Sequence, residues 1–282
     1  FRSVRQRLGP QEKHSKNRNQ ESRIIYMCGI VGIVGKQQAE NVLLQGLERL
    51  EYRGYDSAGI FVADRTSSHL VKAQGRIQNL ADKLTPEVTG TIGIGHTRWA
   101  THGKPSEVNA HPHTSASGRL VLVHNGVIEN FDDLHQTYLA KDVLKGQTDT
   151  EIVVHLIETL MIQEQLTTKE AFKKALSLIQ GSYAFALADV KDPTVIYVAK
   201  NKSPLVIGIG DGFNVVCSDA MAMIDQTHEF LEIADGEMVI VTNNSVAIYD
   251  MAGRSVQRES YQAQLDLSDI EKGTYPYYML KE

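Results

Sequence analysis

The chemistry that this sequence could perform centres on a thiol. Cys28 follows Met27 directly and precedes a glycine-punctuated apolar run, GIVGIVG. If Met27 is removed, Cys28 carries a free α-amine, and such an amine titrates near ~7.7–8.0, so it can take the thiol proton at neutral pH. The apolar strand behind it would hold the nucleophile rigidly. The alternative interpretation is that Cys28 is only a small buried residue.

Further positions could supply what a thiol needs to attack an amide. A strand that ends in Asn125-Gly126 would present an amide side chain and an unhindered backbone N–H, which are two donors for an oxyanion. Arg98 can pair with an α-carboxylate and Asp149 with an α-ammonium, so they could hold an amino acid by its two ends. The simpler interpretations are a plain Asn-Gly turn, a surface ion pair and an acidic residue in a first helical turn.

Metal and phosphate chemistry receive less support from the sequence. Four histidines gather in one region, but no carboxylate stands at ligand spacing: His96, His102, His111 and His113. We expect loop histidines that hydrogen-bond backbone groups rather than a metal site. The glycines of GIVGIVGK do not follow the spacing of a phosphate-binding loop, and GIGDG at 208–212 indicates a hairpin turn. We therefore expect neither a metal nor a cofactor.

Composition limits the class of protein. The chain has 282 residues, 42% hydrophobic and 22% charged, as in a soluble globular protein of one or two domains. No apolar run reaches the roughly 18 residues of a membrane helix. The net charge is −5, of which the first 26 residues contribute +5, so the acidic remainder argues against a nucleic-acid partner. Two distant cysteines, Cys28 and Cys217, favour a reducing, cytoplasmic setting.

The segment 1–26 differs from the rest of the chain. It is polar and basic and has almost no apolar periodicity, so it is predicted to be disordered. It also lacks the apolar centre of a secretory signal. We expect Met27 to be the initiator, with the preceding residues lying upstream of the true start.

Periodicity predicts strands at both ends of the body with helices gathered between them. The expected helices span 39–50, 132–140, 148–166 and 168–179, and Thr148 and Glu151 have capping-box spacing at the start of the third. Strands are expected over 28–35, 59–64, 69–75, the start of 91–103, 119–130 with a turn at Asn125-Gly126, 182–190, 194–200, 205–210, 213–219, 237–243 and 245–250. This order favours a layered α+β fold over alternating βαβ units.

Six motifs occur together in this order: MCGIVG (27–32), EYRGYDSAG (51–59), GHTRWATHG (95–103), NAHPH (109–113), HNGVIEN (124–130) and TDTE (148–151). With these motifs the chain closely resembles the glutaminase domain of the glutamine–fructose-6-phosphate aminotransferase (isomerising) family, the glucosamine-6-phosphate synthases. The resemblance runs from Met27 to Glu282.

The resemblance implies an α+β fold, a four-layer αββα sandwich of the N-terminal-nucleophile amidohydrolase type found in class II glutamine amidotransferases. It implies a glutaminase domain over 27–266. Residues 267–282 would begin the linker to sugar-isomerase domains, which bind fructose 6-phosphate and on which the homodimer of the whole family enzyme largely depends.

The resemblance also implies the site. Cys28 would attack the side-chain amide of L-glutamine and form a thioester, with its α-amine moving the proton. The implied site residues are Cys28, Asn125 and Gly126 in catalysis, Arg98, Trp99, Thr101, His102 and Asp149 in substrate binding, and Arg53 in support of the nucleophile. The reaction would be hydrolysis of glutamine to glutamate and ammonia, which the parent enzyme uses to convert fructose 6-phosphate to glucosamine 6-phosphate.

Two alternatives stay open from the sequence. While Met27 remains attached, the nitrogen of Cys28 is an amide and not a base, so the chain would bind glutamine without turning it over. A truncated domain would be a second route to the same binding-only module. An amidophosphoribosyltransferase would share the N-terminal-cysteine domain, but such enzymes typically have Tyr at the position of Trp99 and lack the RGYDSAG block in this form.

Overall fold

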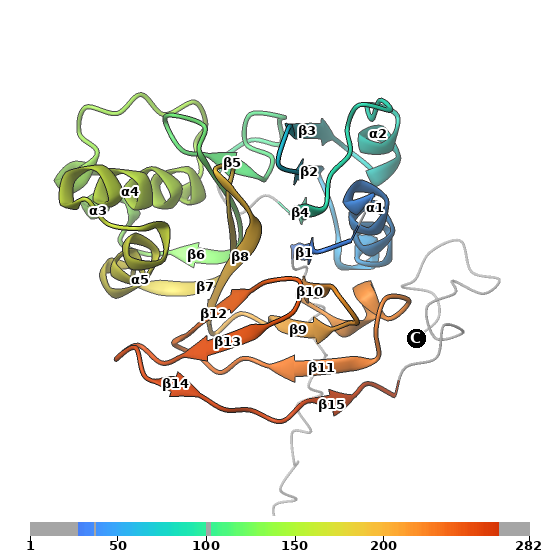
Figure 1. Cartoon of the computed structure of the whole chain (residues 1–282). Coiled ribbons are helices and arrows are strands. Elements are labelled where there is room, and N and C mark those ends of the chain that lie inside the picture. The colour runs from blue at the N-terminus through green and yellow to red at the C-terminus, as the bar shows by residue number, and fades with distance from the viewer. Residues whose placement is uncertain (1–27, 37, 100–102, 265–282) are drawn as a thin grey trace, which may run out of the picture.

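Two stacked antiparallel β-sheets form the centre of the molecule in the computed structural model, which describes residues 28–36, 38–99 and 103–264 (Figure 1). The first sheet has eight strands in the order β15 (Tyr261–Gln262), β11 (Glu229–Glu232), β9 (Val206–Ile209), β10 (Asn214–Cys217), β1 (Gly29–Val34), β4 (Ile92–Arg98), β2 (Ser57–Ala63) and β3 (Ser68–Gln74). We call it sheet A. Sheet B has seven strands in the order β14 (Ser255–Val256), β13 (Val246–Tyr249), β12 (Glu237–Val241), β8 (Asp192–Asn201), β7 (Gly181–Asp189), β6 (Leu120–Ile128) and β5 (His113–Thr114).

Helices cover the outer face of each sheet (Figure 1). On sheet A lie α1 (Ala39–Arg49) and α2 (Ile77–Ala81), and on sheet B lie α3 (Phe131–Tyr138), α4 (Asp149–Glu164) and α5 (Thr168–Leu178). Two short 3₁₀ segments, Glu51–Arg53 and Ala220–Met223, complete the elements that the described residues form. The expected four-layer αββα sandwich is confirmed.

Three apolar cores correspond to the three interfaces between the four layers. One lies between sheet A and α1 and α2, one between the two sheets, and one between sheet B and α3, α4 and α5. In β1, Ile30 and Val34 belong to the core between the sheets, whereas Val31 and Ile33 belong to the core beneath α1. The near-continuous apolar sequence of β1 follows, because a strand covered on both faces must be apolar on both.

The helix α4 begins as the sequence predicts, but with only half of the expected capping box. Thr148 Oγ1 accepts the N–H of Glu151 at 3.3 Å. The carboxylate of Glu151 does not return to Thr148 and instead accepts the N–H groups of Lys145 and Gly146, each at 2.7 Å. A complete box caps α5 instead, between Thr167 and Glu170.

The long expected elements are confirmed, and the errors concern turns and short elements. The turn predicted at Asn125-Gly126 is wrong, because β6 continues to Ile128 and pairs these two residues with Ala184 and Tyr183 of β7. Neither α2 nor the short strands β5, β11, β14 and β15 were expected. None of the helices in the described part of the chain has the length and apolar character that crossing a membrane requires. The predicted boundaries at residues 26 and 266 lie outside the described ranges.

The core beneath α5 generates a stability prediction. Phe172 on α5 is fully buried, with its ring centroid 6.4 Å from Phe185 and 6.5 Å from Tyr197. We expect Phe172→Ala to lower the free energy of unfolding by about 3–5 kcal/mol, because it leaves a cavity among packed rings. Ile162→Ala on α4, where the side chain is 72% exposed, is the control and should change it by less than about 0.5 kcal/mol. Urea denaturation measures both, and equal effects would contradict the packing described.

Candidate active site

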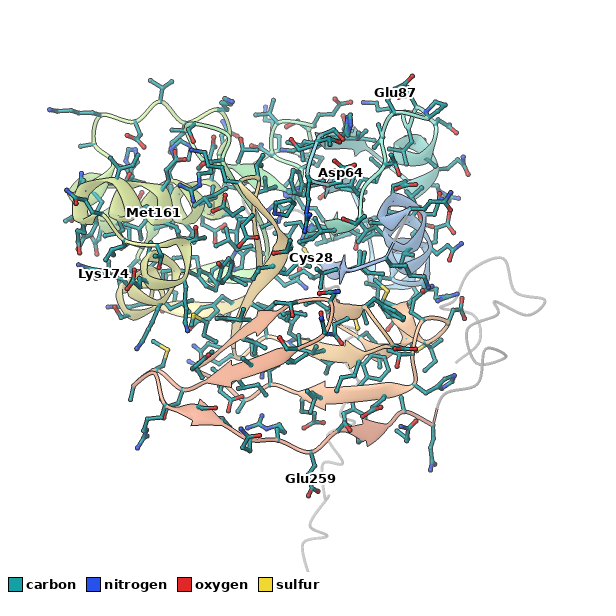
Figure 2. All side chains as sticks on the ribbon, in the orientation of Figure 1. Cys28, Asp64, Glu87, Met161, Lys174 and Glu259 are labelled. Carbon is teal, nitrogen blue, oxygen red and sulfur yellow. The ribbon has the colours of Figure 1, made fainter. Side chains whose placement is uncertain are left out.

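Cys28 lies directly before β1 and contacts the backbone of Trp99, the residue that follows β4. Its Sγ atom is 3.2 Å from the nitrogen of Trp99 and 3.5 Å from the carbonyl oxygen of the same residue. The next residue, Gly29, donates its N–H to Thr97 Oγ1 at 3.0 Å. Figure 2 shows Cys28 near the middle of the molecule, whereas Lys174 and Glu259 lie at its periphery.

Burial raises the pKa of the Cys28 thiol, because the surroundings stabilise the thiolate less well than water does. The N–H of Trp99 and the positive charge of Arg98 oppose this effect and lower the pKa, but the effect of burial is larger. The nearby carboxylate of Asp56 adds to the increase. At neutral pH the thiol therefore keeps its proton unless a base next to it removes that proton.

Sheet B brings the candidate oxyanion donors to this cysteine. Asn125 on β6 is 3% exposed, and its Nδ2 atom donates to the carbonyl oxygen of Cys28 at 2.9 Å. Gly126 follows with a φ of 131°, and a Cβ atom there would stand 2.2 Å from the carbonyl oxygen of Ser182. Glycine alone fits this backbone conformation and this close approach. The pair that sequence analysis placed in a turn therefore belongs to a strand that faces the nucleophile.

One charged candidate, Arg98, lies on sheet A, and the other, Asp149, lies on a helix that contacts sheet B. Arg98 ends β4, is 4% exposed, and has its Nη1 atom 3.7 Å from Asp56 Oδ1. Asp149 is the first residue of α4, and its Oδ2 atom accepts the N–H of Ile128, at the end of β6, at 2.9 Å. Both simpler interpretations therefore hold in part, since Arg98 makes an ion pair and Asp149 is an acidic residue in a first helical turn. The ion pair of Arg98 is nevertheless buried and not at the surface.

The expectation of loop histidines is wrong for two of the four, His96 and His113, which lie in strands. His96 lies in β4 and His113 in β5, whereas His111 stands two residues before β5, and all three are at most 5% exposed. Burial lowers the pKa of His96 to about 3 and those of His111 and His113 well below the ordinary value. Among the described residues, no group of three or more His, Cys, Asp or Glu side chains is arranged to hold a metal ion.

Other predicted site residues are described in part or not at all. Thr101 and His102 lie outside the described residues. Arg53 belongs to the 3₁₀ segment after α1, but its side chain lies outside the described parts. Trp99 is 40% exposed, and its backbone contacts the sulfur of Cys28. Thr97 and His96, which sequence reasoning did not place at the site, contact Gly29 and Asn125 respectively.

The family model of the glutamine amidotransferase domain matches residues 96–226. The chain carries a glutamine amidotransferase domain. The matched segment begins at His96 in β4 and includes the whole of β6, so it contains Arg98, Asn125 and Asp149.

Curated relatives confirm the resemblance that the motifs predicted. The glutamine–fructose-6-phosphate aminotransferase (isomerizing) of Lactococcus lactis subsp. lactis is 66% identical over 257 residues, and that of Streptococcus agalactiae serotype III is 64% identical over 256 residues. Each match covers 91% of this chain and 42% of the relative. The matched part of this chain therefore spans less than half the length of these relatives.

Solved structures share the fold at lower identity. The glutamine phosphoribosylpyrophosphate amidotransferase of B. subtilis has a TM-score of 0.70 at 29% identity, covering 81% of this chain and 50% of that chain. A structure described as the allosteric regulatory enzyme of purine biosynthesis has a TM-score of 0.66 at 30% identity, covering 85% and 50%. These neighbours confirm the N-terminal-nucleophile type of sandwich. The higher identity to the sugar aminotransferases favours that resemblance over the amidophosphoribosyltransferase alternative.

The raised thiol pKa generates a prediction for the chain in which Met27 remains attached. We expect alkylation of Cys28 by iodoacetamide to accelerate about tenfold per pH unit up to the ordinary thiol value of 9.0 and beyond, because only the thiolate reacts. A Cys217→Ser background removes the second thiol, which is fully buried in β10. Mass spectrometry across pH 6–10 measures the rate, and a plateau at or below pH 8 would contradict the prediction.

Proposed function

We propose that this domain hydrolyses L-glutamine to glutamate and ammonia, with Cys28 as the nucleophile. The observation that carries the proposal is the 2.9 Å hydrogen bond from Asn125 Nδ2 to the carbonyl oxygen of Cys28. It places an amide donor against the backbone of the residue that carries the thiol, although the two residues are 97 positions apart in sequence. A nucleophile beside an oxyanion donor is the arrangement that acyl transfer requires.

In the first step, Cys28 Sγ attacks the side-chain amide carbon of glutamine while the free α-amine of Cys28 takes the thiol proton. The resulting oxyanion accepts hydrogen bonds from Asn125 Nδ2 and from the N–H of Gly126. The carbon–nitrogen bond then breaks, and the leaving group receives the proton from the amine and departs as ammonia. Water attacks the γ-glutamyl thioester in the second step, which releases glutamate and restores the thiol.

The α-amine is essential to this mechanism, because burial raises the pKa of Cys28 and leaves the thiol protonated at neutral pH. An α-amine with a pKa of about 7.7–8.0 can serve as the base, but an amide cannot. The proposal therefore applies to a chain that begins at Cys28. The alternative, a module that binds glutamine without turnover, applies to a chain in which Met27 remains attached or to a truncated domain.

Two charged residues would hold the substrate by its α-carbon groups. Arg98 would pair with the α-carboxylate, with Thr101 and His102 contributing as the resemblance implies, and Asp149 would pair with the α-ammonium. Trp99 would close over the bound glutamine, and Arg53 would support the nucleophile. The burial of Arg98 and Asp149, at 4% and 9% exposed, supports these roles because charge pairs are stronger away from water.

In a protein of the relatives' length, the ammonia would convert fructose 6-phosphate to glucosamine 6-phosphate. The relatives' printed name supports this substrate, and residues outside this chain would bind it. Dimerisation, typical of the whole family enzyme, would also rest largely on those residues. A cytoplasmic location fits the two free cysteines, Cys28 and Cys217.

Activity should depend on the amino terminus of the protein. A chain expressed from Met27, and processed to begin at Cys28, is expected to release glutamate and ammonia from glutamine. The full 282-residue chain, in which residues 1–27 precede Cys28, should show no measurable turnover, because its Cys28 nitrogen is an amide. Intact mass defines each amino terminus, and a coupled glutamate assay measures the rate.

The control for that experiment is Cys28→Ala in the processed chain, which should abolish turnover. Thermal melting with and without glutamine then separates binding from catalysis, because a bound ligand raises the melting temperature by mass action. Full turnover in the Cys28→Ala chain would overturn the proposed mechanism. A thermal shift without turnover in the processed wild-type chain would favour the binding-only alternative.

The role of Asp149 can be tested separately from its structural contact. Asp149→Asn keeps an oxygen that can accept the N–H of Ile128 but removes the negative charge. We expect KM for glutamine to rise about 10–100-fold, the range for one lost charge-assisted hydrogen bond. Asp133→Asn, an exposed acid in the first turn of α3, is the matched control and should leave KM unchanged. An unchanged KM in Asp149→Asn would contradict the assigned role.

A further inference from the structure

The proposed mechanism leaves a buried histidine in contact with its machinery. His96 Nε2 lies 2.9 Å from Asn125 Oδ1 and 2.9 Å from the carbonyl oxygen of His124. His96 is on sheet A and both partners are on sheet B, so the two contacts cross between the sheets. We propose that His96 is a positioning residue that fixes the orientation of the Asn125 amide for oxyanion stabilisation. This inference rests on the proposed glutaminase function.

Strand alternation explains why these two side chains face one another. On β4, Ile92 and Ile94 point into the core between the sheets, and His96 follows on the same face because side chains alternate with a period of two. On β6, Val121 and Val123 point into the same core, and Asn125 follows them in the same way. The apolar core between the sheets therefore ends in a polar pair beside Cys28.

The contacts of His96 determine its tautomer. The carbonyl oxygen of His124 can only accept a hydrogen bond, so Nε2 must carry the hydrogen, whichever way the Asn125 amide is turned. Burial lowers the pKa of His96 to about 3, more than its hydrogen bonds raise it, so the ring is neutral at physiological pH. Nδ1 then has no hydrogen, and among the described residues it has no hydrogen-bond partner. The ring of His111 packs against the ring of His96, with 4.2 Å between the two ring centroids.

The neutral Nε2–H tautomer in turn fixes the amide of Asn125. If that amide were reversed, its NH₂ group would face the N–H of His96, and its oxygen would face the carbonyl oxygen of Cys28. Both contacts would then be repulsive, so the observed orientation is the one with both bonds satisfied. Nδ2 carries two hydrogens, and the bond to Cys28 uses one. The other is thereby held in a defined direction, where it can serve the oxyanion of a substrate bound to the thiol.

The test compares variants of His96 in the processed chain. His96→Met replaces the ring by an apolar side chain, and we expect kcat for glutamine to fall about 100-fold with KM changed less than about threefold, as for the loss of one oxyanion donor. His96→Gln is the conservative variant, because its amide nitrogen can stand near the position of Nε2 and donate to Asn125. The kcat of His96→Gln should be at least about tenfold higher than the kcat of His96→Met.

A double-mutant cycle with Asn125→Ala separates positioning from a general structural role. If His96 acts through Asn125, His96→Met should cost less than about threefold in kcat once Asn125 is already Ala. His96→Asn, whose shorter amide does not reach Asn125, gives a second deletion of the donor if the Met variant does not fold. An equal cost in both backgrounds, or no rescue by Gln, would overturn the proposal.

Alkylation of Cys28 supplies a readout that needs no oxyanion. Iodoacetamide is attacked at a saturated carbon, so His96→Met should leave the alkylation rate within about twofold of wild type while kcat falls. A parallel fall in both rates would mean that the site has collapsed and would overturn the proposal. Failure of the proposed function is a distinct result, namely a wild-type processed chain without glutaminase activity.

Discussion

The hydrogen bond between the Asn125 amide and the Cys28 carbonyl oxygen is the contact on which the site depends, because it joins the ends of two separate sheets. Each sheet alone offers an incomplete set of groups: sheet A has the thiol and Arg98, and sheet B has the amide and the end of β6 where Asp149 docks. The apolar core between the sheets sets their separation. At the end of that core the buried groups become polar, and each requires a partner in the facing sheet.

Burial raises the pKa of an acid and lowers the pKa of a base in this region. Both shifts favour the neutral form of the group. Burial raises the pKa of Cys28 and lowers those of the three buried histidines, His96, His111 and His113, because water no longer stabilises the charged forms. A neutral imidazole can be a directed donor without placing a positive charge beside Arg98. A neutral thiol requires an adjacent base, which explains why the proposed chemistry depends on the covalent state of the Cys28 nitrogen.

Proteins with different names share the fold or the sequence of this chain. The solved structures at 29% and 30% identity are described as a glutamine phosphoribosylpyrophosphate amidotransferase and an enzyme of purine biosynthesis, whereas the curated relatives at 64% and 66% are sugar aminotransferases. The two-sheet arrangement that brings Asn125 to Cys28 belongs to the part that these proteins share with this chain. Each of these proteins is longer than the part that matches this chain, which covers 42% of the curated relatives and 50% of the solved structures.

Much of this protein could be predicted from its sequence. Apolar periodicity predicted the long helices and strands, and the motifs around Cys28, Arg98, Asn125 and Asp149 predicted the family and the fold. Short elements such as β5 and β15, each of two residues, were missed because so few residues show no detectable period. The pairing of Asn125-Gly126 with β7 was missed because Asn-Gly has a strong local preference for turns, which the long-range ladder overrides.

The sequence by itself determined which reactive groups exist and which family they belong to, because residue types and local spacing are written in the chain. The tertiary structure alone decided how those groups are paired and which of them are charged. His96 and Asn125 are 29 residues apart in sequence and lie on different sheets, so no local pattern reveals their contact. The neutral state of His96 follows from burial between those sheets, and burial depends on long-range packing rather than on neighbouring residues.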